Sequence, residues 1–123
     1  TTMAMCRLAL SRIFEELPHL KIITHHAGGM VPYYASRIRL DPLKNFYCDT
    51  ALYGNTPALE CAHAYFGPES VLFGTDMPLG ATRDGWCGFT RETIRSVENM
   101  DIPEADKRLI FEGNAKRLLK LST

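Results

Sequence analysis

Three short runs of apolar and β-branched residues, separated by stretches with helical periodicity, constrain this chain most. The runs cover residues 20–24, 45–52 and 70–75. Apolar residues recur at helical spacing over residues 2–17, 32–40, 56–66, 83–100 and 104–121. Strands that alternate with helices pair in parallel through right-handed crossovers, so the sequence predicts an α/β fold with a parallel sheet. Thr56 and Pro57 are typical of an N-cap followed by a proline at the first helical position, and Gly67 of a helix end.

Asp76 follows the third run at the point where that run stops. Residues 71–73 predict a short buried strand, and Gly74 and Pro78 interrupt the chain on either side of the carboxylate. The carboxyl ends of parallel strands form the face at which α/β sheets and barrels bind ligands. Asp76 is therefore a candidate metal ligand or general base. The alternative is that Asp76 caps the next segment or fixes a turn.

His25 and His26 follow the first run in the same way. Imidazole is a common metal ligand and the side chain best suited to proton transfer near neutral pH. Adjacent residues of a strand point to opposite faces, so at most one of the two histidines faces a given site. Gly28 and Gly29 allow a sharp turn and a close approach of the backbone to a ligand. A hydrogen-bonded structural histidine is the alternative.

Four segments resemble the metal-dependent amidohydrolase superfamily, in the branch that contains aminocarboxymuconate semialdehyde decarboxylase and the dihydroxybenzoate decarboxylases. They are residues 18–32, 45–50, 73–78 and 113–119, and they follow the family's order. The resemblance implies a (β/α)8 TIM barrel, of which this chain would be the C-terminal part, about strands 6–8 with their helices. A complete barrel needs roughly 200–250 residues, so we expect residues 1–123 to be a partial barrel domain. The family's His-x-His pair and the histidine after its fifth strand have no counterpart here.

The resemblance also implies roles for individual residues. Asp76 matches the metal-ligating aspartate of the eighth strand. His26 matches the histidine of the sixth strand that acts on the substrate or on metal-bound water, and His25 takes its place if the register shifts by one. Arg37 matches an arginine that binds a substrate carboxylate, in some members across a dimer interface, with a solvated helix charge as the alternative. The expected cofactor is a divalent metal, zinc first and manganese second.

Three functions follow from these assignments. The first is non-oxidative decarboxylation of a small unsaturated or aromatic carboxylic acid, with His26 transferring a proton. The second is metal-dependent hydrolysis of a lactone, amide or ester. The third is an inactive truncated fragment, because the metal site is incomplete without the other strands; we expect the isolated segment to be inactive. The expected assembly is a homodimer or a higher homo-oligomer.

Composition excludes some other classes of function. The formal net charge is zero, which argues against nucleic acid or an anionic membrane surface as a partner. No apolar run is long enough to cross a membrane. The four cysteines form no Cys-x-x-Cys pair, so we expect reduced thiols in a cytoplasmic protein.

Several other polar residues are expected to be structural. Asp49 should support its loop by hydrogen bonding, although Asp49 or Thr50 could instead line the pocket. His19 and His63 are predicted to be structural, and Asn114 to satisfy backbone groups at a helix boundary. Trp86 is predicted to make a core or lid contact.

Overall fold

The fold is a three-stranded parallel sheet with helices on both sides. The computed structural model describes residues 1–38, 44–79, 85 and 87–121. Within them the sheet has the order β1 (Ile22–Thr24), β2 (Phe46–Asp49) and β3 (Val71–Leu72). Thr24 pairs with Cys48 and Asp49 pairs with Leu72 across parallel ladders. The prediction of an α/β fold with parallel strands is confirmed, and each strand is shorter than the apolar run that predicted it.

Helical segments precede the first strand, connect the strands and follow the last one. In chain order they are α1 (Thr2–Ala9), α2 (Ile13–Glu16), η1 (His26–Gly28), α3 (Val31–Ile38), α4 (Thr56–Phe66), α6 (Gly88–Glu98), α7 (Glu104–Arg108), the π-helical η2 (Leu109–Gly113) and α8 (Asn114–Leu119). The predicted residues 39–40, 83–84 and 86 lie outside the described ranges.

Two predicted helix boundaries were wrong. The first helical stretch is not continuous, because Ser11 interrupts it: its hydroxyl donates to the Leu8 carbonyl at 2.7 Å and accepts the Ile13 N–H at 3.2 Å. A serine that bonds to nearby backbone competes with helix continuation. The N-cap of α4 is Asn55 and not Thr56, because the Asn55 side chain accepts the Ala58 N–H at 3.3 Å.

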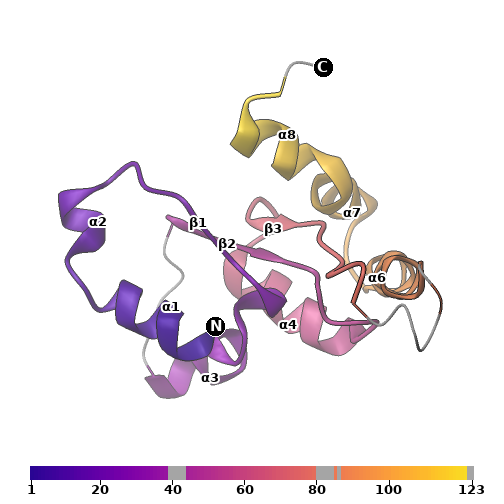
Figure 1. The fold of residues 1–123 in the computed structure, drawn as a ribbon, viewed down its shortest axis with the longest axis horizontal. Coiled ribbons are helices and arrows are strands. Elements are labelled where there is room, and N and C mark those ends of the chain that lie inside the picture. Colours follow the sequence, from indigo (N-terminus) through magenta and orange to yellow (C-terminus); the bar gives the residue numbers. More distant parts are fainter. Residues whose placement is uncertain (39–43, 80–84, 86, 122–123) are drawn as a thin grey trace.

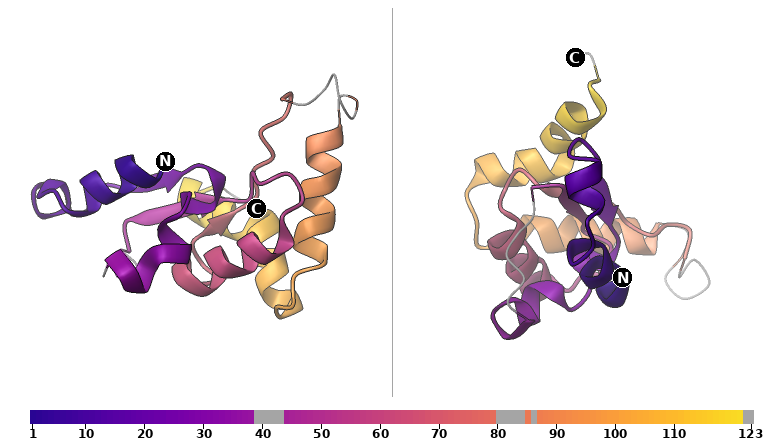
Figure 2. Two further views of the ribbon diagram at one scale, coloured as in Figure 1. Left: turned by 90° about the horizontal axis from the view of Figure 1, so that it is seen from below. Right: turned by 90° about the vertical axis from the view of Figure 1, so that its left-hand side faces the viewer.

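The core lies between the sheet and the helices α3 and α4. Phe46, Cys48 and Val71 belong to one buried cluster with Leu59 and Ala62 of α4. Figure 1 shows α3 and α4 on one side of the sheet and α8 on the other. In both Figure 1 and Figure 2, α1 and α2 lie at one end of the molecule and α6 at the other. The loops that contain the candidate site residues follow the carboxyl ends of β1 and β3.

The opposite face of the sheet is less completely covered. Ile23 is 45% exposed there. A cavity of about 210 Å³ lies between Ile23 and Leu72 of the sheet and Leu118 and Leu119 of α8. Among the described residues, no helix combines the length and the apolar character that crossing a bilayer requires.

Candidate functional site at the carboxyl ends of the strands

His26 and Asp76 meet at the carboxyl end of the sheet. His26 Nε2 lies 3.1 Å from Asp76 Oδ2, although the two residues are 50 positions apart in the chain. Their side chains are 51% and 33% exposed, so both remain accessible to a ligand. The two residues follow strands whose carboxyl ends share one edge of the sheet, as the sequence analysis expected, and the structure shows that their side chains converge there. An imidazole beside a carboxylate provides a proton-transfer group next to an oxygen ligand for a metal.

Both residues have left-handed backbone conformations. φ is 54° at His26 and 62° at Asp76, and Ala27 in the same turn as His26 has φ of 53°. Such angles are uncommon outside glycine, although His and Asp adopt them more often than most residues. Backbone strain of this kind concentrates at functional sites. The turns that carry the two side chains are therefore unusual at the positions that the sequence singled out.

Gly28 and Gly29 allow the turn after β1 to form, as the sequence predicted. Gly28 has φ of +79°, and a Cβ placed on it would lie 2.7 Å from Cζ of Phe66. Gly29 has φ of +65°. The backbone of η1 therefore packs directly on the α4 helix, and this contact fixes the base of the His26 turn.

Asp49 supports the loop by hydrogen bonding, as predicted. Its Oδ1 accepts the N–H groups of Ala27 at 3.3 Å and of Ala51 at 3.1 Å. Its Oδ2 lies 3.4 Å from Nδ1 of His25. The structure thus places His25 beside Asp49 and His26 beside Asp76, which favours His26 over His25 as the residue that acts with Asp76.

Thr50 makes a reciprocal contact that the sequence did not reveal. Its hydroxyl donates to the Gly74 carbonyl at 2.9 Å and accepts the Gly74 N–H at 3.0 Å. The partners are 24 residues apart, and their meeting depends on the pairing of β2 with β3. The only available signal was the position of Thr50 at a strand end, next to Asp49.

Arg37 is exposed in the last turn of α3. It follows Val31 by six positions, which corresponds to about 9 Å along a helix axis. Among the described residues, no hydrogen bond or ion pair joins Arg37 to His26 or Asp76. The structure therefore brings together two of the three predicted site residues, and the role of Arg37 stays a prediction.

The donor set fits part of a metal site. The described residues contain no group of three or more His, Cys, Asp or Glu side chains placed to hold a metal ion. A catalytic zinc site uses three protein ligands. Asp76 and His26 have side-chain atoms of a kind that bind metals. The Cys48 thiol does not, because burial, and after it the nearby charge of Asp49, raises its pKa and keeps it protonated. The part of the chain that the structure describes thus provides at most a share of such a site.

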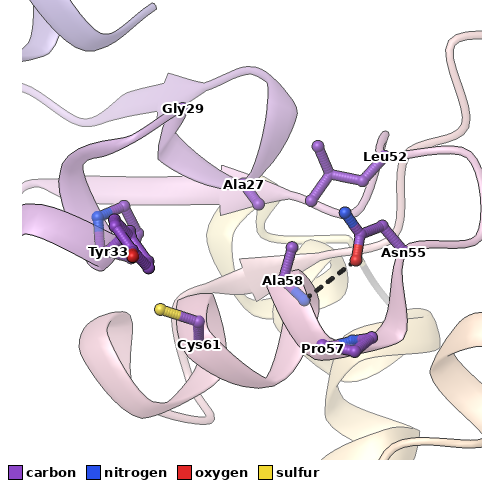
Figure 3. A pocket seen from close by; sticks show the side chains of 9 residues that line it. Ala27, Gly29, Tyr33, Leu52, Asn55, Pro57, Ala58 and Cys61 are labelled. Carbon is purple, nitrogen blue, oxygen red and sulfur yellow. Dashed lines mark hydrogen bonds between the residues drawn. The ribbon is translucent and has the colours of Figure 1, made fainter.

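A pocket of about 460 Å³ lies between the turn that contains His26 and the helices α3 and α4. Its walls come from Ala27 and Gly29 of the turn, Tyr33 of α3, and Ala58 and Cys61 of α4. Figure 3 shows Tyr33 and Cys61 on the walls formed by their two helices. His26 and Asp76 do not line this pocket, so the convergence of the two side chains is a separate feature at the strand ends.

Other polar residues have structural contacts. His63 Nε2 lies 3.0 Å from Asp106 Oδ2 and links α4 to α7. Asn114 is fully buried and donates to the carbonyls of Pro68 and Val71 at 2.7 and 2.8 Å. His63 and Asn114 thus have structural contacts, as predicted. The backbone groups that Asn114 binds lie between α4 and β3 and in β3, and not at the start of its own helix as expected. Trp86 lies outside the described residues.

The sequence profile of the amidohydrolase family matches residues 1–121. This chain belongs to the amidohydrolase family. The family's solved structures include TIM-barrel enzymes of the decarboxylase branch, so the parallel strands belong to a fold of that kind. The assignment to strands 6–8 of the barrel, and to a partial domain over residues 1–123, stays a prediction.

Two curated relatives and one solved structure illustrate the branch. A 2-keto-4-carboxy-3-hexenedioate hydratase of Sphingobium sp. strain SYK-6 is 32% identical over 132 residues, which cover 95% of this chain and 38% of that protein. A 6-methylsalicylic acid decarboxylase of Penicillium expansum is 31% identical over 135 residues, covering 96% and 40%. A dihydroxybenzoic acid decarboxylase from Polaromonas sp. JS666, solved with bound manganese and 2-nitroresorcinol, has a TM-score of 0.71 and 29% identity, covering 94% and 38%. This chain spans about two fifths of the length of these relatives.

Proposed function

We propose that the protein containing this chain catalyses the metal-dependent, non-oxidative decarboxylation of a small aromatic or unsaturated carboxylic acid. The observation that carries the proposal is the 3.1 Å contact between His26 Nε2 and Asp76 Oδ2 at the shared carboxyl end of parallel strands. Decarboxylases of aromatic acids among the relatives support the reaction class.

Asp76 would hold a divalent metal through a carboxylate oxygen. Manganese is bound in the Polaromonas relative, and zinc is the first expectation from the sequence, so the identity of the metal is part of the proposal. When bound, such a metal supplies Lewis-acid polarisation of substrate oxygens. The remaining ligands would come from outside the residues that the structure describes.

His26 would transfer the proton. In decarboxylation, the bond between the substrate carbon and its carboxyl group breaks and leaves the electron pair on that carbon. Carbon dioxide departs, and a proton takes its place on the carbon. The His26 imidazole is half-exposed and lies beside Asp76, so it can deliver that proton to a substrate held next to the carboxylate.

Arg37 would bind a substrate carboxylate through its planar guanidinium group. Because it lies on the exposed last turn of α3, we propose that it acts on the site of a neighbouring subunit in a homodimer or larger homo-oligomer. Small carboxylic acids are the proposed ligands.

Hydration of an unsaturated acid is the second candidate. It is favoured by the hydratase of Sphingobium, which matches 95% of this chain. His26 and Asp76 would also carry out this reaction. His26 would move a proton to or from a carbon of the substrate while water adds to a double bond. Hydrolysis of a lactone, amide or ester stays a prediction from the sequence alone.

The test compares His26→Asn with His19→Asn in the complete protein. His19 is an exposed histidine outside the site and provides the same substitution as a control. Release of carbon dioxide from 2,6-dihydroxybenzoate and 6-methylsalicylate, and hydration of an unsaturated tricarboxylic acid, are measured with each variant. His26→Asn should lower kcat about 10²–10⁴-fold, with metal content near that of the unmodified protein, and His19→Asn should change neither.

Asp76→Ala and Arg37→Ala separate the remaining roles. Asp76→Ala should lose both metal and activity. Arg37→Ala should mainly raise KM, because a carboxylate contact held throughout the reaction provides uniform binding; Arg7→Ala, on the exposed side of α1, is its control. Full activity of His26→Asn, or loss of its metal, would remove the proton-transfer role. Hydration without carbon dioxide release would select the second candidate.

A further inference from the structure

The middle strand β2 carries neither His26 nor Asp76, yet its end binds the backbone on both sides. Toward β1, Asp49 Oδ1 accepts the N–H of Ala27, the residue after His26, at 3.3 Å. Toward β3, the Thr50 hydroxyl exchanges two hydrogen bonds with Gly74, two residues before Asp76, at 2.9 and 3.0 Å. Two consecutive residues thus join the two turns that carry the candidate site.

We propose that Asp49 and Thr50 form a clamp that positions His26 relative to Asp76. We name these two residues the β2 clamp. This inference rests on the proposed function of His26 and Asp76, and it adds two positioning residues that do not contact the reacting atoms. Displacement of a catalytic group by about 1 Å can cost about 10²-fold in rate, so the separation of the two side chains is a quantity that the fold must control.

Burial supports the clamp. Thr50 is fully buried and Asp49 is 9% exposed, so solvent cannot readily replace their hydrogen bonds. The Thr50 hydroxyl serves both backbone groups of Gly74 at once. A side chain of the same shape without the hydroxyl would leave a backbone donor and an acceptor unpaired, which a protein interior tolerates poorly.

The packing around Gly74 also supports the clamp. A Cβ on Gly74 would lie 3.0 Å from the Cβ of Asp49. The end of β3 therefore packs against the clamp as closely as a glycine backbone allows. A Cβ at this position requires a shift of a few tenths of an ångström between Gly74 and Asp49, and we expect this shift to displace Asp76, two residues later.

The main test uses Thr50→Val, Thr50→Ser and a matched control, Thr93→Val. Thr93 is also fully buried, but its hydroxyl has no hydrogen-bond partner in the described structure. In the complete protein, Thr50→Val should lower kcat about 10–100-fold with KM within about threefold, because substrate still binds and only the alignment is lost. Thr50→Ser should restore most of the rate, and Thr93→Val should stay within about threefold. A Thr50→Val enzyme with the kcat of Thr93→Val would overturn the proposal.

A second measurement does not depend on turnover. The imidazole signals of ¹³C,¹⁵N-histidine-labelled protein are recorded by NMR at one pH, with His26 assigned through His26→Asn. Thr50→Val should shift the His26 signals and Thr93→Val should not; unmoved signals would refute the clamp. If even the unmodified protein turns over none of the substrates, the proposed function fails, and the NMR result still decides the positioning.

A third variant covers the case in which Thr50→Val does not fold. Gly74→Ala keeps the Thr50 hydroxyl and displaces the end of β3 through its contact with Asp49. Like Thr50→Val, Gly74→Ala should shift the His26 signals and lower kcat, and it should not lose the metal. Signals and kcat equal to those of the unmodified protein would contradict the clamp.

Discussion

Gly28→Ala should destabilise the fold through two separable effects. Gly28 has φ of +79°, and the new Cβ would lie 2.7 and 2.8 Å from two ring carbons of Phe66. A left-handed conformation costs an L-residue about 1–2 kcal/mol. Overpacking a filled site costs a further 1–3 kcal/mol, approximately. The free energy of unfolding should therefore fall by about 2–5 kcal/mol.

Gly67→Ala adds a Cβ at a glycine-favouring position without a packing contact. Gly67 has φ of +81° and ψ of 161°, and a Cβ there would meet no atom within 4 Å. This backbone region is essentially restricted to glycine, so the cost should be a conformational term alone of about 1–3 kcal/mol. The contact between the His26 turn and Phe66 is then measured by the coupling of Gly28→Ala to a substitution of Phe66.

Urea unfolding followed by circular dichroism gives both values by linear extrapolation. Phe66→Leu removes the ring carbons, so the double variant with Gly28→Ala should show a coupling energy of about 1–3 kcal/mol. Equal costs for Gly28→Ala and Gly67→Ala, without coupling to Phe66→Leu, would refute the argument that packing fixes this turn.

Three further predictions concern the buried Asn114 and Cys48 side chains. Asn114→Ala should lower the free energy of unfolding, measured in urea, by about 1–3 kcal/mol, because the buried Val71 carbonyl loses its donor; a loss below about 1 kcal/mol would contradict this. Iodoacetamide should label the exposed Cys87 but not the buried Cys48 in the folded protein, as read by mass spectrometry. Because burial raises the pKa of the Cys48 thiol, its contribution to stability is complete below the ordinary thiol pKa of about 8.5 and falls by up to about 1.4 kcal/mol per pH unit above it. Cys48→Ala should lose this part of the dependence of the unfolding free energy on pH. An unchanged dependence would refute the assignment to Cys48.

Hydrophobic periodicity was sufficient to predict the order of the elements. Each apolar run that formed a strand was bounded by glycine, proline or polar residues, and each strand pairs in parallel as expected. The convergence of His26 and Asp76 could be predicted for the same reason. Parallel strands bring their carboxyl ends to one edge, so the end of each run indicates which side chains meet there.

Competition between neighbouring polar residues limited the prediction of helix ends. Asn55 and Thr56 are both good N-caps, and the backbone conformation decides which one is used. Ser11 lies within a stretch of helical periodicity, but its hydroxyl bonds to local backbone and ends the helix. The spacing of apolar residues does not decide between such candidate helix ends, because the stabilities that they give the helix differ by only about 1 kcal/mol.

The contacts of Asp49 and Thr50 depend on strand register, which the sequence does not contain. Asp49 faces the His26 turn because β2 pairs with β1 through Thr24 and Cys48, and Thr50 meets Gly74 because Asp49 pairs with Leu72. A shift of one residue would turn both side chains to the other face. The sequence could therefore predict that Asp49 forms hydrogen bonds, but not which backbone groups it binds.

The energies of these contacts link folding to the proposed chemistry. His26 and Ala27 are both left-handed, which costs about 1–2 kcal/mol each, and the turn persists because other interactions offset that cost. The hydrogen bond that Asp49 accepts from the Ala27 N–H contributes about 0.5–1.5 kcal/mol. Asp49 therefore offsets part of the strain, and the packing of Gly28 on Phe66 also holds the turn that directs His26 toward Asp76. Residues that resemble ordinary loop support in the sequence thus contribute to the geometry in which the two candidate site residues meet.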